Sequence, residues 1–369
     1  MTISLEAKEK VGEERMEKVE IGKMERLKRH LDKFLLVYIG IAMVVGLSIG
    51  APLFRQIETI KPFLKILNLV IIVLMIYPMM VGLNFGELWN IPKVWKQFLF
   101  ALIIGLVYAP LFMALLIRII PMNSYLSFGL VLVFSVPCTS MAIAATGLAK
   151  GNTELATILV AIQFILALAI SPLWISLFGS AYHVPFPMFI IIETLVIIVV
   201  IPMLVGYATK STIKRKGGDA AISKARSSLP SVSFLALFTM IFLIFMEQGH
   251  LIVLQWQSVI VTFVPLILYY SITILLLTVL DLIFKVKYRD HMAIVFGTVG
   301  KNEGTAMAIA LAGGIGLGAV PAAIAPLIQV PLLATYLKFH WKVAGLFSKR
   351  SPHLVNKYEL HEIEIEEEK

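Results

Sequence analysis

The chain has 369 residues, of which 59% are hydrophobic and 15% are charged, and its formal net charge is +9. Soluble domains are roughly one quarter charged, so this composition, with a mean hydropathy of +0.89, excludes an ordinary soluble fold and favours one membrane unit. The basic residues lie almost wholly outside the apolar runs, which is typical of topology signals rather than of a surface for nucleic acid.

Residues 1–33 alternate Lys and Arg with Glu and contain no apolar run of membrane length, so we predict a cytosolic amphipathic segment without a signal peptide. About 20 apolar residues cross the hydrocarbon core as a helix. The first half of the chain, residues 34–178, then contains five predicted spans: Phe34–Leu53, Ile66–Phe85, Phe98–Ile117, Leu126–Leu148 and Leu155–Phe178.

An outer loop is predicted at residues 179–187, before a second set of five spans in residues 188–339. These spans are Met188–Ala208, Leu229–Phe245, Ser258–Phe284, His291–Gly313 and Gly318–Phe339. A basic cytosolic loop is expected at residues 209–228 and a cytosolic tail at residues 340–369.

Lys and Arg in the short loops predict the orientation. With a cytosolic N-terminus the inner loops contain twelve of these residues and the outer loops four. The excess on the inside predicts that both termini are cytoplasmic and that the number of spans is even, in a multi-pass protein of the cell membrane.

A short sequence recurs in the two halves. The fourth span contains Thr-Ser-Met-Ala-Ile-Ala at residues 139–144, and the ninth contains Thr-Ala-Met-Ala-Ile-Ala at residues 305–310. Both copies occupy the fourth span of a five-span half, and halves with an odd number of spans insert in opposite senses. The layout is typical of the inverted repeats of secondary transporters.

Each copy begins with residues that break helices: Val136-Pro137-Cys138 in the fourth span, and the Gly-rich run from Gly297 to Gly304 in the ninth. Non-helical backbone at membrane depth is tolerated only where it is buried in protein or lines a wet cavity. We therefore predict that the two breaks lie next to each other and mark the substrate site.

Few side chains within the spans can do chemistry. We single out Glu193, which is near enough to the outer interface to reach headgroups, and Lys301 and Glu303, which flank Asn302 in the ninth-span break. The Lys301–Glu303 pair is interpreted either as an ion-coupling site or as a structural ion pair. Cys138, the only cysteine, is interpreted either as a small apolar side chain or as a soft ligand for a metalloid.

Other polar side chains are possible helpers or packing contacts between helices: Asn84, Thr139, Ser140, Gln163, Thr298, Thr305 and Gln329. A GxxxG pattern at Gly46–Gly50 indicates close helix packing. The sequence lacks a Walker lysine loop, HExxH and CxxC, so we expect neither an enzyme nor a bound cofactor.

The segments Pro137–Met141 and Leu148–Asn152 resemble the fourth-helix signature of the arsenite-efflux permeases, which belong to the bile acid/sodium symporter superfamily. Residues 75–80, 201–206 and 326–331 agree with the same superfamily. The resemblance implies an all-α fold of ten helices in two inverted five-helix repeats. It also implies panel and core domains, with broken, crossing fourth and ninth helices.

The resemblance further implies that Cys138 binds substrate and that a ninth-helix glutamate acts in transport. Glu303 lies one position before the place of that glutamate, which Gly304 occupies. Lys301-Asn302-x-Gly304 is more similar to sodium-coupled carriers of organic anions, and Gln329 replaces a common tenth-helix glutamate.

Three functions follow from these residues. The leading one is efflux of arsenite or antimonite in exchange for protons: Cys138, Thr139, Ser140 and Thr305 contact the substrate, and Glu303 carries the proton beside Lys301 and Asn302. The second is a sodium-coupled symporter of an organic anion. The third is a membrane receptor or scaffold without flux, which would leave the paired breaks without a purpose.

Overall fold

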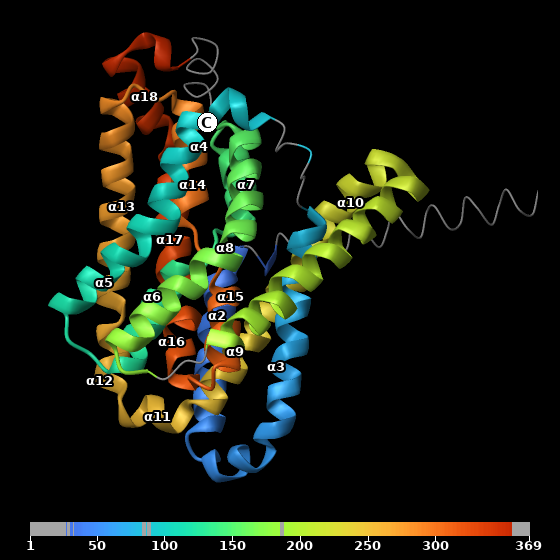
Figure 1. The fold of residues 1–369 in the computed structure, drawn as a ribbon, viewed down its shortest axis with the longest axis vertical. Coiled ribbons are helices and arrows are strands. Elements are labelled where there is room, and N and C mark those ends of the chain that lie inside the picture. The colour runs from blue at the N-terminus through green and yellow to red at the C-terminus, as the bar shows by residue number, and fades with distance from the viewer. Residues whose placement is uncertain are drawn as a thin grey trace, which may run out of the picture.

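The computed structural model describes residues 27, 30–31, 33–82, 86, 90–184 and 188–355, and in these ranges the regular structure is helical apart from one isolated β-bridge. Figure 1 shows the helices of the first half. In chain order they are α2 (Leu35–Gly50), α3 (Phe54–Gly82), α4 (Ile91–Ile103), the π-helix η2 (Ile104–Tyr108), α5 (Ala109–Ile119), α6 (Ser124–Ser135), α7 (Met141–Leu148) and α8 (Thr153–Ala181).

The second half begins with α9 (Met188–Leu195), the π-helix η3 (Val196–Val200) and the long α10 (Ile201–Glu247). It continues with α11 (Gly249–Leu254), α12 (Trp256–Val261), α13 (Phe263–Ile283), α14 (Tyr288–Val299), α15 (Glu303–Ala312), α16 (Gly316–Ile324), α17 (Pro326–Lys338), α18 (His340–Arg350) and the 3-10 turn η4 (Pro352–Leu354).

Seven helical stretches of the described residues are long and apolar enough to cross a membrane. They are Phe54–Gly82, Ile91–Ile119, Thr153–Ala181, Ile192–Gly218, Leu229–Glu247, Trp256–Ile283 and Gly316–Lys338. The other three predicted spans correspond to the 16-residue α2 and to the broken pairs α6–α7 and α14–α15. The all-helical, polytopic membrane class is therefore confirmed, whereas the inverted symmetry of the two halves stays a prediction.

Some helices continue beyond the apolar runs from which the spans were predicted. Helix α3 begins at Phe54 rather than near Ile66, and its first turns contain an exposed Glu58–Lys61 ion pair with a 2.7 Å contact. The basic segment 209–228 lies within α10 as well. The direction of α10 changes at Gly218, whose φ of +65° is a value that glycine adopts readily. Hydropathy marks only the part of a helix that lies in hydrocarbon.

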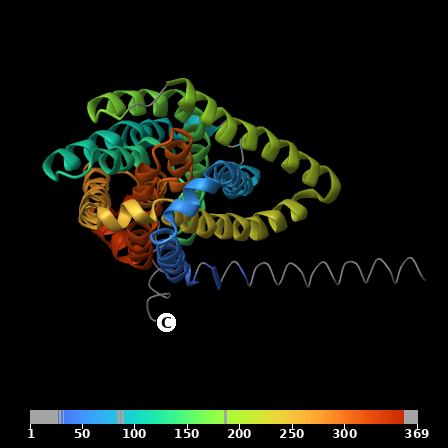
Figure 2. The ribbon, with the colours of Figure 1, turned by 90° about the horizontal axis from the view of Figure 1, so that it is seen from below.

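The helices α2 and α3 both pack on α10, and Figure 2 shows the two arms of α10 with α3 between them. Gly46 and Gly50 of α2 lie directly against α10, where a side chain at Gly50 would collide with the Met246 backbone. The GxxxG pattern is thus a packing contact, as predicted. A second group contains α4 to α8 and α13 to α17. The two groups also touch, because α3 packs on α15 and α10 on α16, and the division into panel and core domains stays a prediction.

The start of the predicted tail forms the amphipathic helix α18. Its buried Phe347 packs against the His291 ring, with 4.7 Å between ring centroids, whereas Lys349 and Arg350 are exposed. Figure 1 places α18 at the end of the bundle where α13 ends and α14 begins.

Candidate functional site

The first helix break lies between α6 and α7. Proline has no N–H and disfavours a helical conformation in the residue before it, and Val136 is accordingly extended, with φ −94° and ψ 163°. The Ser171 hydroxyl of α8 donates a 2.6 Å hydrogen bond to the Ser135 carbonyl at the end of α6. The chain therefore leaves the helix at Pro137 without stranding that buried carbonyl.

The second break, between α14 and α15, pairs with the first. Cys138 and Lys301 form an antiparallel β-bridge. Its two hydrogen bonds run from the Thr139 N–H to the Gly300 carbonyl (3.2 Å) and from the Asn302 N–H to the Pro137 carbonyl (3.0 Å). The predicted adjacency of the breaks is confirmed, and the pairing satisfies backbone groups that would otherwise be exposed at membrane depth.

Two glutamines complete the hydrogen bonding of the breaks. Gln163 of α8 accepts from the Cys138 N–H (3.1 Å) and donates to the Gly297 carbonyl (2.7 Å). Gln329 of α17 accepts from the Lys301 N–H (2.7 Å) and donates to the Lys301 carbonyl (3.4 Å). Each side chain comes from the span that follows a broken span, and both of these predicted helper residues lie at the paired breaks.

The Lys301 side chain is fully buried and extends to the π-helix η2. Its Nζ donates to the Gly105 carbonyl at 2.5 Å. The Trp174 indole donates to the next carbonyl, Leu106, at 2.7 Å. Because a π-turn disturbs the i→i−4 hydrogen-bond pattern, it offers carbonyls to outside donors. The ammonium is thus bound by main-chain oxygen.

Lys301 and Glu303 form no ion pair in the described part of the chain, although the sequence allowed a structural one. Glu303 begins α15 and is 9% exposed, and its Oε1 is buried without a hydrogen-bond partner among the described residues. The same holds for the Thr305 hydroxyl in that helical turn. Two oxygens without a hydrogen-bond partner among the described residues therefore lie in the first turn of α15.

The remaining predicted site residues are distributed as follows. The Asn302 carbonyl oxygen caps α15 by accepting from the Thr305 N–H at 3.1 Å. The Ser140 N–H lies 3.3 Å from the Met79 sulfur of α3, so the first break also contacts the other helical group. Cys138 is fully buried at the bridge. Glu193 is exposed on α9, and Asn84 lies outside the described residues.

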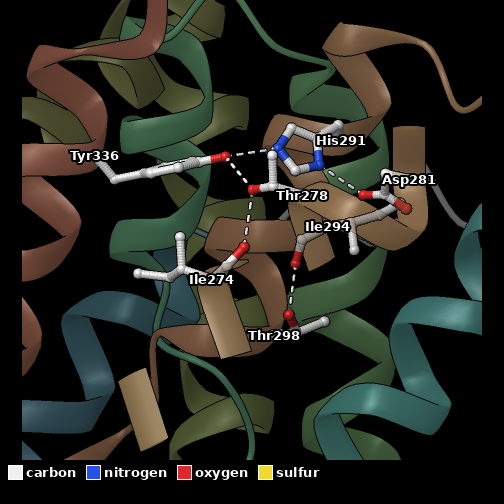
Figure 3. A network of polar contacts seen from close by, with 7 residues as sticks. All are labelled: Ile274, Thr278, Asp281, His291, Ile294, Thr298 and Tyr336. Atoms are coloured by element: carbon white, nitrogen blue, oxygen red, sulfur yellow. Dashed lines mark hydrogen bonds and ion pairs between the residues drawn. The ribbon is translucent and has the colours of Figure 1, made fainter. Parts of the chain in front are cut away.

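The sequence reasoning missed one polar cluster. Asp281 falls inside the predicted eighth span and His291 opens the ninth, and the structure joins them at 2.6 Å, with Tyr336 beyond the imidazole (Figure 3). The sequence alone could have indicated this cluster, because an ionisable residue within a predicted span, such as Asp281, is a candidate functional residue.

Comparison with known proteins identifies the family to which this protein belongs. Residues 69–255, just over half of the chain, match the sodium bile acid symporter family. The chain belongs to this family. It is a multi-pass membrane protein, and its relatives support a secondary transporter rather than an enzyme.

Two relatives extend the likeness over most of the chain, and a third matches a little more than half of it. An uncharacterized transporter of Synechocystis sp. is 26% identical, and the match covers 86% of this chain and 90% of the relative. The arsenical-resistance protein Acr3 of Alkaliphilus metalliredigens is 26% identical, with 84% and 93% covered. An uncharacterized sodium-dependent transporter, YocS, of Bacillus subtilis is 28% identical over 56% of this chain and 63% of the relative.

Proposed function

We propose that this protein extrudes arsenite or antimonite across the cell membrane in exchange for protons, with both termini in the cytoplasm. The observation that carries the proposal is the place of the only cysteine, Cys138, at the bridge between two broken helices. A soft sulfur selects soft metals and metalloids. The similarity to an arsenical-resistance protein over most of both chains supports the same substrate.

The proposed substrate step is reversible. The Cys138 thiol reacts with one As–OH group of the neutral trihydroxide: an As–S bond forms, an As–O bond breaks, and the thiol proton leaves with the hydroxide as water. One sulfur holds the metalloid loosely enough for release, which transport requires. Thr139, Ser140 and Thr305 offer hydroxyls near the break, and Glu303 carries the exchanged proton.

Substitution of Cys138 tests the substrate. Cys138→Ser keeps the size and hydrogen-bonding character of the side chain but removes the soft ligand. We expect loss of arsenite resistance in an arsenite-sensitive host and loss of arsenite efflux from cells, with normal membrane insertion. Thr298→Val, at a buried residue of α14 whose hydroxyl donates to the Ile294 carbonyl of the same helix, is a matched control that keeps resistance. Full resistance of Cys138→Ser would contradict the proposal.

A second function has its own observation in its favour. Glu303 Oε1 and the Thr305 hydroxyl, which have no hydrogen-bond partner among the described residues, are hard ligands of the kind that sodium prefers, and the buried Lys301 ammonium would attract an anion. A sodium-coupled symporter of an organic anion fits these groups, and one relative is named sodium-dependent. In that case Thr305→Val abolishes sodium-dependent uptake of taurocholate into proteoliposomes and Thr298→Val does not. Proton exchange predicts no sodium-dependent uptake in either variant.

A further inference from the structure

A buried chain of polar side chains joins three helices at the end of the bundle that carries α18. Asp281 Oδ2 of α13 lies 2.6 Å from Nδ1 of His291 in α14, and His291 Nε2 lies 2.7 Å from the Tyr336 hydroxyl of α17. Figure 3 shows the Tyr336 oxygen between the imidazole and Thr278 of α13, which is 2.9 Å away. Asp281 and His291 are both 0% exposed.

The hydrogen bonds determine how many protons this network of side chains holds. The Thr278 hydroxyl has one proton and donates it to the Ile274 carbonyl at 2.8 Å, because a carbonyl can only accept. The Thr278 oxygen must then accept from Tyr336, and the Tyr336 oxygen must accept from His291. His291 Nε2 therefore carries a hydrogen in this arrangement.

One further proton must lie between His291 and Asp281. Two bare acceptors, Nδ1 and a carboxylate oxygen, would repel each other at 2.6 Å, so a hydrogen lies between them. Since Nε2 already carries its own hydrogen, the pair is either imidazolium with carboxylate or neutral imidazole with carboxylic acid. Both forms are neutral overall, which suits a fully buried site.

We propose that Asp281 and His291 form a proton-binding site, separate from the paired breaks, that takes up and releases one proton during the transport cycle. On release, Asp281 keeps its negative charge, Nδ1 keeps its hydrogen and Nε2 becomes a bare acceptor. The Tyr336 hydroxyl then rotates its hydrogen from Thr278 to Nε2. This rotation needs no heavy atom of the hydrogen-bonded network to change place.

The surroundings suit a site that changes charge. The side chains facing the pair are Tyr336 and Thr278, with the apolar Phe347 ring of α18 over the imidazole. Asp290, the neighbour of His291, is bound instead by Asn152 (2.7 Å) and Gln97 (3.3 Å). The cations on the neighbouring segments are exposed: Lys93, Lys96, Lys285, Lys287, Arg289, Lys338, Lys342, Lys349 and Arg350. Asp281 Oδ1 has no hydrogen-bond partner among the described residues, which leaves a polar atom for an incoming water.

The site also lies on the helix that leads to the breaks. His291 is in the first turn of α14, and Gly300 directly follows its last residue, roughly 14 Å further along at 1.5 Å per residue. A change of charge at His291 alters the attachment of α14 to α13 and α17, and α14 carries one side of the Cys138–Lys301 bridge. The inference thus deepens the proposed proton exchange and rests on it for its role in transport.

Nitrogen NMR of histidine measures directly, without any substrate, which ring nitrogens of His291 carry a hydrogen. The full chain would be labelled with nitrogen-15 in histidine and placed in lipid nanodiscs, and the His291 signal assigned by its loss in His291→Gln. We expect Nε2 to change from hydrogen-bearing to bare as the pH rises. Asp281→Asn and Tyr336→Phe displace or abolish this change, whereas Asp290→Asn, the matched buried carboxylate of α14, leaves it in place.

Two results would overturn the inference: a His291 ring that keeps one protonation state over the whole stable pH range, or a titration that is unchanged in Asp281→Asn. In proteoliposomes, Asp281→Asn and Tyr336→Phe should lose or displace the pH response of arsenite flux while Asp290→Asn keeps it. An unaltered pH response in both variants equally contradicts the inference. Because the NMR change requires no arsenite, a wrong substrate and a wrong proton site give different results.

Discussion

Two glutamine side chains show why particular residues occupy the breaks. An amide offers both a donor and an acceptor, and Gln163 and Gln329 use both on backbone groups that a broken helix leaves without partners. Gln329 also accepts from the Tyr270 hydroxyl at 3.0 Å. Glutamate would offer acceptors only when ionised and would add a charge beside Cys138 or Lys301.

Gln329→Leu should therefore destabilise the protein. The change leaves the buried Lys301 N–H and the Tyr270 hydroxyl without their acceptor, at a cost of about 1–3 kcal/mol for each unsatisfied group. Denaturant unfolding in detergent measures this loss of free energy. Gln257→Leu, at an exposed residue of α12, is the control and should change stability little. Equal stability of the two variants would refute the assigned hydrogen bonds.

At the scale of single residues, the sequence was informative where a residue type is rare in a membrane span. Lys301 and Glu303 stood out for that reason, and Cys138 stood out because it follows Pro137 at a predicted helix break. Their partners did not, because no pattern predicts that the Gly105 carbonyl is freed by a π-turn. Asp281 and His291 were within predicted spans but near span ends, where charges are ordinary, and only the folded chain brings them together.

Among the elements, close contact between helix backbones positions the broken helices. A Cβ at Gly129 of α6 would lie 3.0 Å from the Gly318 Cα of α16 and closer still to the Gly318 carbonyl. The first half of the fourth predicted span thus packs directly on the start of the tenth. This contact fixes one end of the segment that leads to Pro137.

Gly129→Ala should destabilise the fold by about 1–3 kcal/mol, because backbone cannot move aside as a flexible side chain can. Gly40→Ala in α2 is the matched control, since a Cβ there meets nothing within 4 Å. It should be neutral or stabilising by about 0.5–1 kcal/mol, as alanine favours a helix over glycine. Thermal unfolding in nanodiscs compares the two, and a Gly129→Ala variant as stable as Gly40→Ala would refute this packing.

The elements themselves were predicted unevenly. Hydropathy located the apolar runs, and the Pro and Gly residues located both breaks. The ends of α3 and the reversal of α10 at Gly218 could not be located by hydropathy, because those helical turns are polar. The amphipathic α18 was included in a cytosolic tail for the same reason.

For the whole molecule, the membrane class and family follow from composition and from motifs spread over most of the chain, and the match to residues 69–255 agrees. Substrate and coupling ion do not follow in the same way. Cys138 favours a metalloid, whereas Lys301, Glu303 and Thr305 also suit an anion with sodium. The same fold accommodates either kind of substrate. Which one is transported depends on these side chains, and binding or flux measurements must identify their ligands.

Flux of labelled arsenite into proteoliposomes tests the central claim most directly. Transport would be measured in sodium-free buffer at several imposed pH gradients, and then with sodium gradients at fixed pH. Proton exchange predicts arsenite flux without sodium that follows the size and direction of the pH gradient and is lost in Cys138→Ser. Arsenite flux that vanishes without sodium at every pH, or that ignores the pH gradient, would contradict it.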